Sequence, residues 1–258
     1  MKTFFTITAG RTGTAWLRSF LSLNFGIEAI HEPRGIDDFG TQMPDIRTMR
    51  NFNNFGNNKI VRDFWKNKFN SLEGEIYAET NHTLAKCGLI ENLINSDLAN
   101  ESTIIILKRN LVKQCLSFLV RQDFRNITMA WQWYLHPSYK KIIINPTPFM
   151  QMSDIGVTLW YCYEMAARQE YYRQKYSDKL KFVDVSLEEV TKLDGAQSFL
   201  SALHVNDECK MPPPENQNKA NPSSELVEKV TQVIDSTNFD VEILTKDLIS
   251  KGFSFESV

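Results

Sequence analysis

The chain has 258 residues, enough for one domain with a large core. Hydrophobic residues at 42% and charged residues at 23% are ordinary for a globular protein, and a formal net charge of −2 disfavours a general nucleic-acid-binding protein. No apolar run approaches the roughly 18–20 residues that cross a bilayer, and MKTFFTITAGRTGT lacks the long apolar region of a signal peptide. We therefore expect a cytoplasmic protein that binds neither nucleic acid nor membrane.

Cysteine and histidine spacing gives no sign of a disulfide framework or a metal site. Scattered cysteines without a CxxC pair favour reduced structural thiols, and they are Cys87, Cys115, Cys162 and Cys209. The histidines also lack a metal-ligand spacing, and they are His31, His82, His136 and His204.

Strand patterns alternate with helical patterns along the chain. Strands are predicted at 2–8, 27–30, 76–79, 102–107 and 180–185. Helices are predicted at 14–25, 83–97, 111–121, 157–177 and 222–235, the last with Asn221 as N-cap and Pro222 in its first turn. Residues 34–58, rich in Asn, Asp, Gly and Phe, are expected to form a long surface excursion or lid. Without repeats or a linker, this alternation predicts one α/β domain over residues 1–258, with a central parallel sheet flanked by helices.

A Gly/Thr-rich turn joins the first strand to the first helix, and residues 8–17 read TAGRTGTAWL. Gly10 and Gly13 let the backbone fold around an anion at the helix N terminus. The hydroxyls of Thr12 and Thr14 add donors, and Arg11 supplies a charged fork. A tight turn with an exposed arginine is the alternative. A Walker loop is disfavoured, because that pattern has lysine directly after its last glycine.

A second candidate phosphate site follows the strand at 102–107. This strand delivers Arg109 to the carboxyl edge of the sheet, where open α/β folds bind ligands. Ser117 lies on the next helix, so the two side chains can converge on one phosphate. The alternative is an arginine that ends a strand and a serine on a helix, without a shared ligand.

Together the two motifs resemble the sulfotransferase superfamily. Residues 8–17 are similar to its 5′-phosphosulfate loop, and Arg109 followed eight positions later by Ser117 is similar to its 3′-phosphate motif. The resemblance covers 3–33 and 103–120, with a looser match at 182–188 (FVDVSLE). It implies a bacterial cytoplasmic enzyme of secondary metabolism. Such an enzyme moves a sulfuryl group from 3′-phosphoadenosine 5′-phosphosulfate to a hydroxyl or amine of a small-molecule acceptor, without a metal.

The resemblance also implies roles for individual residues. Arg11 replaces the lysine of cytosolic enzymes, as in tyrosylprotein sulfotransferases, and neutralises charge on the departing phosphate. Trp16 packs against adenine, although a place in the core of the first helix is equally expected. The family's C-terminal Arg-Lys-Gly is absent, and Lys219 is the nearest basic substitute. The implied nucleotide contacts are Gly10, Arg11, Thr12, Gly13, Thr14, Ala15, Trp16, Arg109, Ser117 and Lys219.

A hydroxyl acceptor needs a general base, and three residues are candidates. Glu32 ranks first, because its spacing from Arg11 matches that of the catalytic glutamate in tyrosylprotein sulfotransferases. His82 is its rival, roughly where cytosolic enzymes keep their catalytic histidine. His31 ranks third, because neighbouring side chains on a strand point in opposite directions. A surface carboxylate and a hydrogen-bonded loop imidazole are the alternatives for Glu32 and His82.

Two other functions stay open, a P-loop kinase or phosphotransferase and a catalytically inactive nucleotide-binding interaction module. The absent Walker lysine and the lack of an obvious Mg²⁺-binding aspartate after a buried strand disfavour the first. The presence of Arg11, Glu32, Arg109 and Ser117 disfavours the second. Aromatic side chains either line an acceptor pocket or pack in insertions, and these are Phe39, Phe52, Phe55, Phe64, Trp65, Trp131, Trp133, Tyr134 and Phe149.

Overall fold

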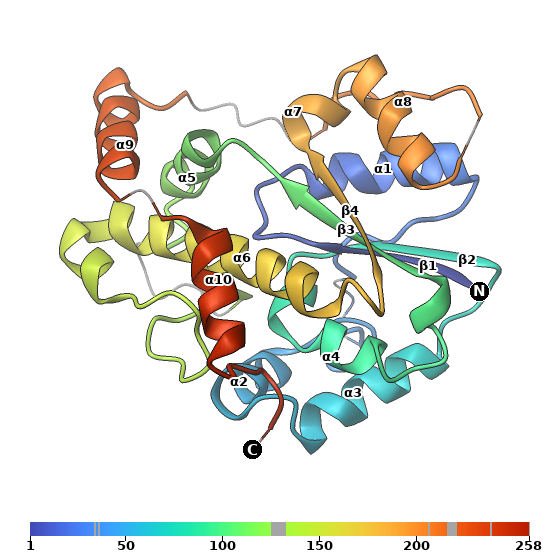
Figure 1. Ribbon diagram of the computed structural model, residues 1–258. Helices are drawn as coiled ribbons and strands as arrows, with labels where there is room; N and C mark the ends of the chain where they lie inside the picture. Colours follow the sequence, from blue (N-terminus) through green and yellow to red (C-terminus); the bar gives the residue numbers. More distant parts are fainter. Residues whose placement is uncertain are drawn as a thin grey trace.

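A computed structural model of the chain describes residues 1–33, 35, 37–124, 133–205, 207–215, 221–237 and 239–257. Within these ranges, the strands form one parallel sheet in the order β2-β1-β3-β4 (Figure 1). Their bounds are β1 Lys2–Ile7, β2 Ile76–Thr80, β3 Ser102–Lys108 and β4 Lys181–Ser186. The predicted α/β fold with a central parallel sheet is confirmed.

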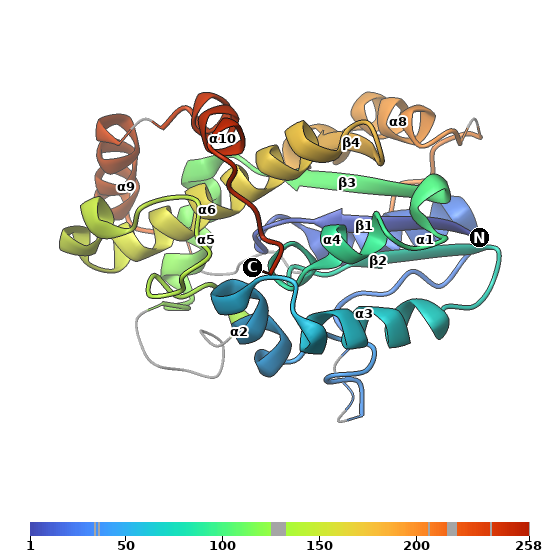
Figure 2. The same cartoon turned by 60° about the horizontal axis from the view of Figure 1, so that its bottom comes forward.

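Helices cover both faces of the sheet, because β1, β2 and β3 bury side chains on both sides (Figures 1 and 2). On β3, Ile104 and Ile106 belong to the larger core, whereas Ile105 and Leu107 belong to the smaller one. The helices of the smaller core are α1 Thr14–Phe25, α7 Leu187–Val190 and α8 Leu193–Ala202. Those of the larger core are α2 Ile46–Phe55, α3 Lys59–Asn70, α4 Leu89–Leu93, α5 Leu111–Val120, α6 Ser153–Tyr176, α9 Ser224–Ser236 and α10 Val241–Ser250. Short 3₁₀ turns complete the fold: η1 Leu84–Lys86, η2 Ala99–Glu101 and η4 Thr147–Met152.

The strand order places a ligand-binding position at the carboxyl end of β1. The chain leaves β1 toward β2 on one side, and after β2 it crosses to β3 on the other side. Open α/β sheets bind ligands where successive crossovers diverge in this way. The turn after β1 therefore lies where the fold opens a crevice.

The predicted strand at 27–30 is wrong, because only Ile30 makes an isolated bridge, to Glu79. The end of α1 supplies the reason. The backbone N–H of Ile27 donates to the carbonyl of Ser22, and that of Ala29 donates to the Ser22 hydroxyl. These donors are thus used by the helix end instead of by β2. Glu32, two residues after Ile30, has a positive φ of 44°, which is not a strand conformation.

Three other predicted boundaries also need correction. The excursion expected at 34–58 contains α2, which Asp45 caps by accepting from the Thr48 N–H at 2.7 Å. The helix expected at 83–97 is divided into η1 and α4 by Gly88, which has a φ of 83°. The N-cap of α9 is Ser223, not Asn221, because the Ser223 hydroxyl accepts from the Leu226 N–H.

A fully buried ion pair joins α3 to the end of β2. The ammonium of Lys68 lies 2.6 Å from the carboxylate of Glu79, and both side chains have no exposed surface. Lys68 also donates to the carbonyl of Gln42, while Glu79 accepts from Tyr77 at 2.8 Å and from Asn81 at 3.2 Å. Burial is tolerated here because the charges are paired and hydrogen-bonded.

Replacing Lys68 with methionine is therefore expected to destabilise the fold by about 3–5 kcal/mol, because the Glu79 carboxylate stays buried without its counter-charge. Urea unfolding monitored by circular dichroism measures this loss. Lys59→Met is the matched control on the same helix: its partner is Asp63, the two side chains are 80% and 55% exposed, and the expected loss is about 0.3–0.5 kcal/mol. Equal losses in the two variants would contradict a structural role for the buried pair.

Candidate active site

The turn between β1 and α1 has an unusual backbone. Gly10, Arg11 and Gly13 all have positive φ angles, of 87°, 57° and 87°. A Cβ atom on Gly13 would lie 2.5 Å from Cδ1 of Leu187, so glycine meets a steric as well as a conformational requirement there. Gly13 is also the N-cap of α1, and a glycine has no side chain that could cap the first backbone N–H groups of this helix. The N terminus of α1 is thus open to a ligand.

The carbonyl oxygens of this turn are bound by side chains from other elements. The hydrogen bonds are Tyr161 Oη to Ala9 O (2.7 Å), Gln114 Nε2 to Gly10 O (2.9 Å) and Arg109 Nη1 to Arg11 O (2.8 Å). In a trans peptide the N–H points opposite to the preceding C=O. The N–H groups of residues 10–12 consequently point away from these side chains, in the manner of an anion-binding loop.

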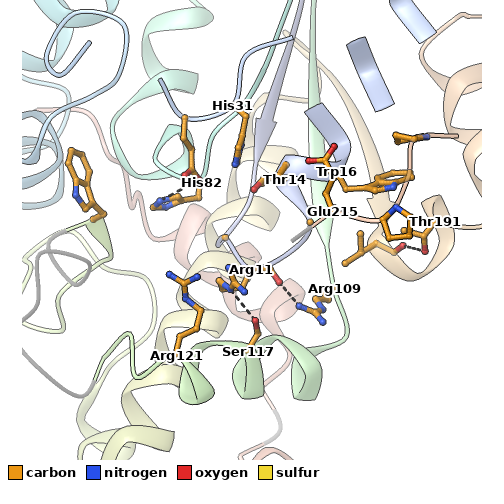
Figure 3. A pocket seen from close by; sticks show the side chains of 18 of the residues that line it. Arg11, Thr14, Trp16, His31, His82, Arg109, Ser117, Arg121, Thr191 and Glu215 are labelled. Carbon is orange, nitrogen blue, oxygen red and sulfur yellow. Dashed lines mark hydrogen bonds and ion pairs between the residues drawn. The ribbon is translucent and has the colours of Figure 1, made fainter. Parts of the chain in front are cut away.

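The two motifs from the sequence meet at this turn. Arg11 Nε donates to Ser117 Oγ at 3.0 Å, while Arg109 holds the carbonyl of Arg11, which precedes it by 98 residues (Figure 3). Arg109 Nε is buried and has no hydrogen-bond partner among the described residues. Burial lowers the pKa of both arginines, and the charge of Arg121 lowers that of Arg11 further. A cationic site with an unused buried donor is suited to a phosphate or sulfate.

These groups open into a cavity of about 980 Å³, a size typical of ligand sites. Figure 3 shows Arg11, Arg109 and Ser117 on one wall, His31 and His82 across from Arg11, and Trp16 and Thr191 farther along. The other residues that line the cavity include Gly10, Gly13, Thr14, Ala15, Glu32, Arg121, Leu187, Met211, Pro212, Pro214 and Glu215. The cavity therefore brings most of the predicted nucleotide-binding residues together with all three candidate bases.

Three predicted nucleotide contacts need comment. Thr12 is buried and does not line this cavity; its hydroxyl lies 2.5 Å from that of Thr8. The ring of Trp16 stacks on Phe20 (centroids 5.3 Å apart) in the smaller core, as one of its two expected roles requires, and the residue also lines the cavity. Its contact with adenine stays a prediction. Lys219 lies outside the described residues.

All three candidate bases line the cavity. His82 Nε2 lies 3.7 Å from Glu32 Oε1, and these side chains are only 11% and 10% exposed. His31 Nδ1 lies 2.8 Å from the carbonyl oxygen of Thr80. The expectation that His31 and Glu32 point in opposite directions is not met, because both line the cavity and Glu32 does not have strand geometry.

The aromatic residues divide into two groups. The rings of Phe39 and Trp133 lie 5.3 Å apart and line the cavity with Met43 and Tyr134. Packing explains most of the others, because Phe52, Phe64, Trp65 and Phe149 are buried in the larger core. Phe55 is exposed, and Trp131 lies outside the described residues.

Sequence reasoning missed two basic residues of the site, Lys86 and Arg121. Lys86 is fully buried and lies 2.8 Å from Nδ1 of His82, whereas Arg121 lines the cavity beside Arg11 (Figure 3). Each follows a predicted site residue by four positions, His82 and Ser117 respectively. That spacing places side chains on one face of a helical turn, and it was the available signal.

Gly13→Ala is expected to destabilise the protein by more than the roughly 1–2 kcal/mol of a left-handed alanine, because the new methyl group also meets Leu187. Thermal unfolding and sulfate binding measured by calorimetry report the two effects. Gly26→Ala is the control, since Gly26 has a φ of 66° with no atom within 4 Å of the added Cβ. If the double variant Gly13→Ala/Leu187→Ala regains part of the lost stability, the loss is due to the clash between the new methyl group and Leu187. Equal losses of stability in Gly13→Ala and Gly26→Ala would exclude such a clash.

No family model matches the sequence, no curated protein matches it, and within the described chain no helix is long and apolar enough to cross a membrane. The described residues also contain no group of three or more side chains placed to ligate a metal ion. The structure is similar to the crystal structure of a sulfotransferase from Alicyclobacillus acidocaldarius, with a TM-score of 0.50 and 15% identity over 97% of this chain and 96% of that one. At this identity, the likeness shows that the two chains share the sulfotransferase fold.

Proposed function

We propose that the chain is a sulfotransferase that uses 3′-phosphoadenosine 5′-phosphosulfate and delivers the sulfuryl group to a hydroxyl or amine of a small-molecule acceptor. The observation that carries this proposal is the junction of Arg11, Ser117 and Arg109 in a cavity that also contains Glu32 and His82. Residues that hold two anionic groups thus lie beside residues that can accept a proton.

The described residues fit the nucleotide. The outward N–H groups of the turn and the open N terminus of α1 suit the 5′-phosphosulfate. Arg109, with its unused buried Nε, and Ser117 suit the 3′-phosphate. Trp16, Leu187, Thr191 and Pro212 also line the cavity and offer a largely apolar surface for adenine. Lys219 stays a proposed contact by resemblance alone.

Transfer proceeds as an in-line displacement at sulfur, so positioning and charge neutralisation dominate catalysis. The acceptor oxygen forms a new bond to sulfur while the bond from sulfur to the 5′-phosphate oxygen breaks, and its electron pair stays on the phosphate. Arg11 and the N–H groups of the turn neutralise that charge. Glu32 takes the proton of the acceptor hydroxyl, and an amine acceptor loses its proton to the same group.

A P-loop kinase is the less favoured function, since Thr14 stands where a Walker loop has lysine. The buried, unlinked thiols at the four cysteine positions support a cytoplasmic location as part of the proposal.

The proposed contact with the 3′-phosphate can be tested by nucleotide binding. 3′-phosphoadenosine 5′-phosphate is expected to raise the melting temperature more than ATP with Mg²⁺, since Arg109 and Ser117 engage the 3′-phosphate. Arg109→Ala weakens its binding by about 1.5–3 kcal/mol, the loss of charge-assisted hydrogen bonds, as measured by calorimetry.

Two controls show whether this loss is specific. AMP, which lacks the 3′-phosphate, is expected to bind wild type and Arg109→Ala alike. Lys108→Ala removes a neighbouring cation whose partner is Asp184 and leaves affinity unchanged. If Arg109→Ala weakened the binding of AMP by the same amount, Arg109 would not contact the 3′-phosphate and would only hold the Arg11 carbonyl in place.

The assignment of Glu32 as the general base can be tested by substitution. Glu32→Gln preserves the shape of the side chain and nucleotide affinity, but turnover with a hydroxyl acceptor falls about 10²–10⁴-fold, the usual worth of a positioned general base. His82→Asn costs less. Steady-state kinetics with sulfated product quantified by mass spectrometry measures both. Near-normal turnover in Glu32→Gln together with a collapse in His82→Asn would assign the base to the histidine.

A further inference from the structure

Lys86 is a buried cation to which the mechanism above gives no role. It ends η1, has no exposed surface, and follows His82 by four residues. Its ammonium nitrogen lies 2.6 Å from the carbonyl oxygen of Trp133, 3.1 Å from the hydroxyl of Tyr161 and 2.8 Å from Nδ1 of His82. An ammonium has three N–H donors, so these three neighbours match its full donor set.

The chemistry of the three partners decides which atom donates in each hydrogen bond of Lys86. The Trp133 carbonyl only accepts. The Tyr161 hydroxyl donates its own proton to the carbonyl of Ala9 at 2.7 Å, so toward Lys86 it accepts. The third N–H of the charged lysine therefore donates to Nδ1 of His82. A neutral imidazole that accepts at Nδ1 carries its proton on Nε2.

The other side of the imidazole ring faces the first-choice base. Nε2 of His82 lies 3.7 Å from Glu32 Oε1, and a Cβ atom added to Gly10 would lie 3.3 Å from Cβ of His82. The ring also packs against Tyr134, with centroids 5.4 Å apart. His82 is thus held between Lys86 and Glu32, with Nδ1 toward one and Nε2 toward the other.

We propose that Lys86 is a positioning residue whose charged form keeps the proton of His82 on Nε2, so that in this state His82 orients the Glu32 carboxylate and cannot itself act as the base. The catalytic part of this inference rests on the proposed function, whereas the tautomer does not. A ring that accepts at Nδ1 and carries a proton on Nε2 has no lone pair left for an acceptor hydroxyl.

The surroundings of Lys86 make this arrangement depend on pH. Burial lowers the pKa of Lys86 to about 7; Arg168 on α6 lowers it further, while Cys87 and Glu32 oppose the shift. The rings of Tyr134 and Tyr161 also face the ammonium, 5.1 and 5.5 Å from it. The lysine is charged below this pKa and neutral above it. Above about pH 7 its lone pair accepts from Nδ1–H, and Nε2 then presents a lone pair instead of a donor.

The tautomer is tested without any assay of activity, by NMR of the ¹⁵N-histidine-labelled protein, with His82→Asn identifying the signals. At pH 6 we expect a protonated Nε2 and an unprotonated Nδ1 for His82. Above pH 7 the proton appears on Nδ1, and Lys86→Met removes the preference seen at pH 6. A protonated Nδ1 at pH 6 in the wild type, or an unchanged tautomer in Lys86→Met, would overturn the proposal.

The catalytic consequence is tested by the pH dependence of kcat/KM. If His82 must donate to Glu32, the rate falls as pH rises through about 7, whereas a histidine base gives a rate that rises there. Lys86→Gln keeps an N–H donor that does not titrate, so this alkaline limb is expected to disappear. Lys86→Met is expected to lower kcat about tenfold, the worth of one hydrogen bond, with unchanged nucleotide affinity.

A rate that rises through pH 7 in the wild type, or a limb that persists in Lys86→Gln, contradicts the role of Lys86. A complete lack of sulfuryl transfer in the wild type would instead reject the proposed function, while the NMR result would still decide the tautomer.

Discussion

The site depends on side chains that bind the carbonyl oxygens of the turn after β1. Tyr161 comes from α6, Gln114 from α5, and Arg109 from the end of β3. A turn of this length has no secondary structure to satisfy its own backbone, and buried carbonyls must be paired. Each peptide N–H of the turn points away from the side chain that binds the carbonyl of the same peptide. Packing of α5 and α6 on the sheet thus shapes the turn that we propose to bind an anion.

The same packing concentrates positive charge before any ligand arrives. Arg11, Arg109 and Arg121 all line one cavity, and burial together with the neighbouring charge lowers the pKa of Arg11. Like charges brought together in a partly buried site raise the free energy of the folded protein. An anion bound in this cavity relieves the repulsion, so binding of the proposed nucleotide would stabilise the fold. The turn and the arginines therefore belong to a single electrostatic arrangement.

Sequence patterns predicted the parts of this arrangement that local chemistry determines. The strand and helix on either side of residues 8–13 follow from β-branched runs and helical spacing, and Arg109 with Ser117 follows from a strand end. Contacts between elements that are far apart in the chain leave no such pattern in the sequence. The role of Gln114 and the place of Lys86 arise from tertiary packing, and the cap of α2 at Asp45 was hidden among polar residues. The strand expected at 27–30 failed because a serine hydroxyl near the helix end takes a backbone donor that a strand would use.

The buried pair of Lys68 and Glu79 has a consequence for how the acceptor preference of such a protein can diverge. Lys68 holds the Gln42 carbonyl, next to Met43 on the cavity wall, and Glu79 holds Asn81, next to His82. This anchor uses a main-chain oxygen at Gln42 and does not depend on the side chains of Phe39 and Met43. Substitutions at those two positions change the shape of the wall while the backbone beneath it and the neighbouring histidine stay in place. Under the proposed function, the acceptor preference could therefore change through residues 39 and 43 while Glu32 and His82 keep their places.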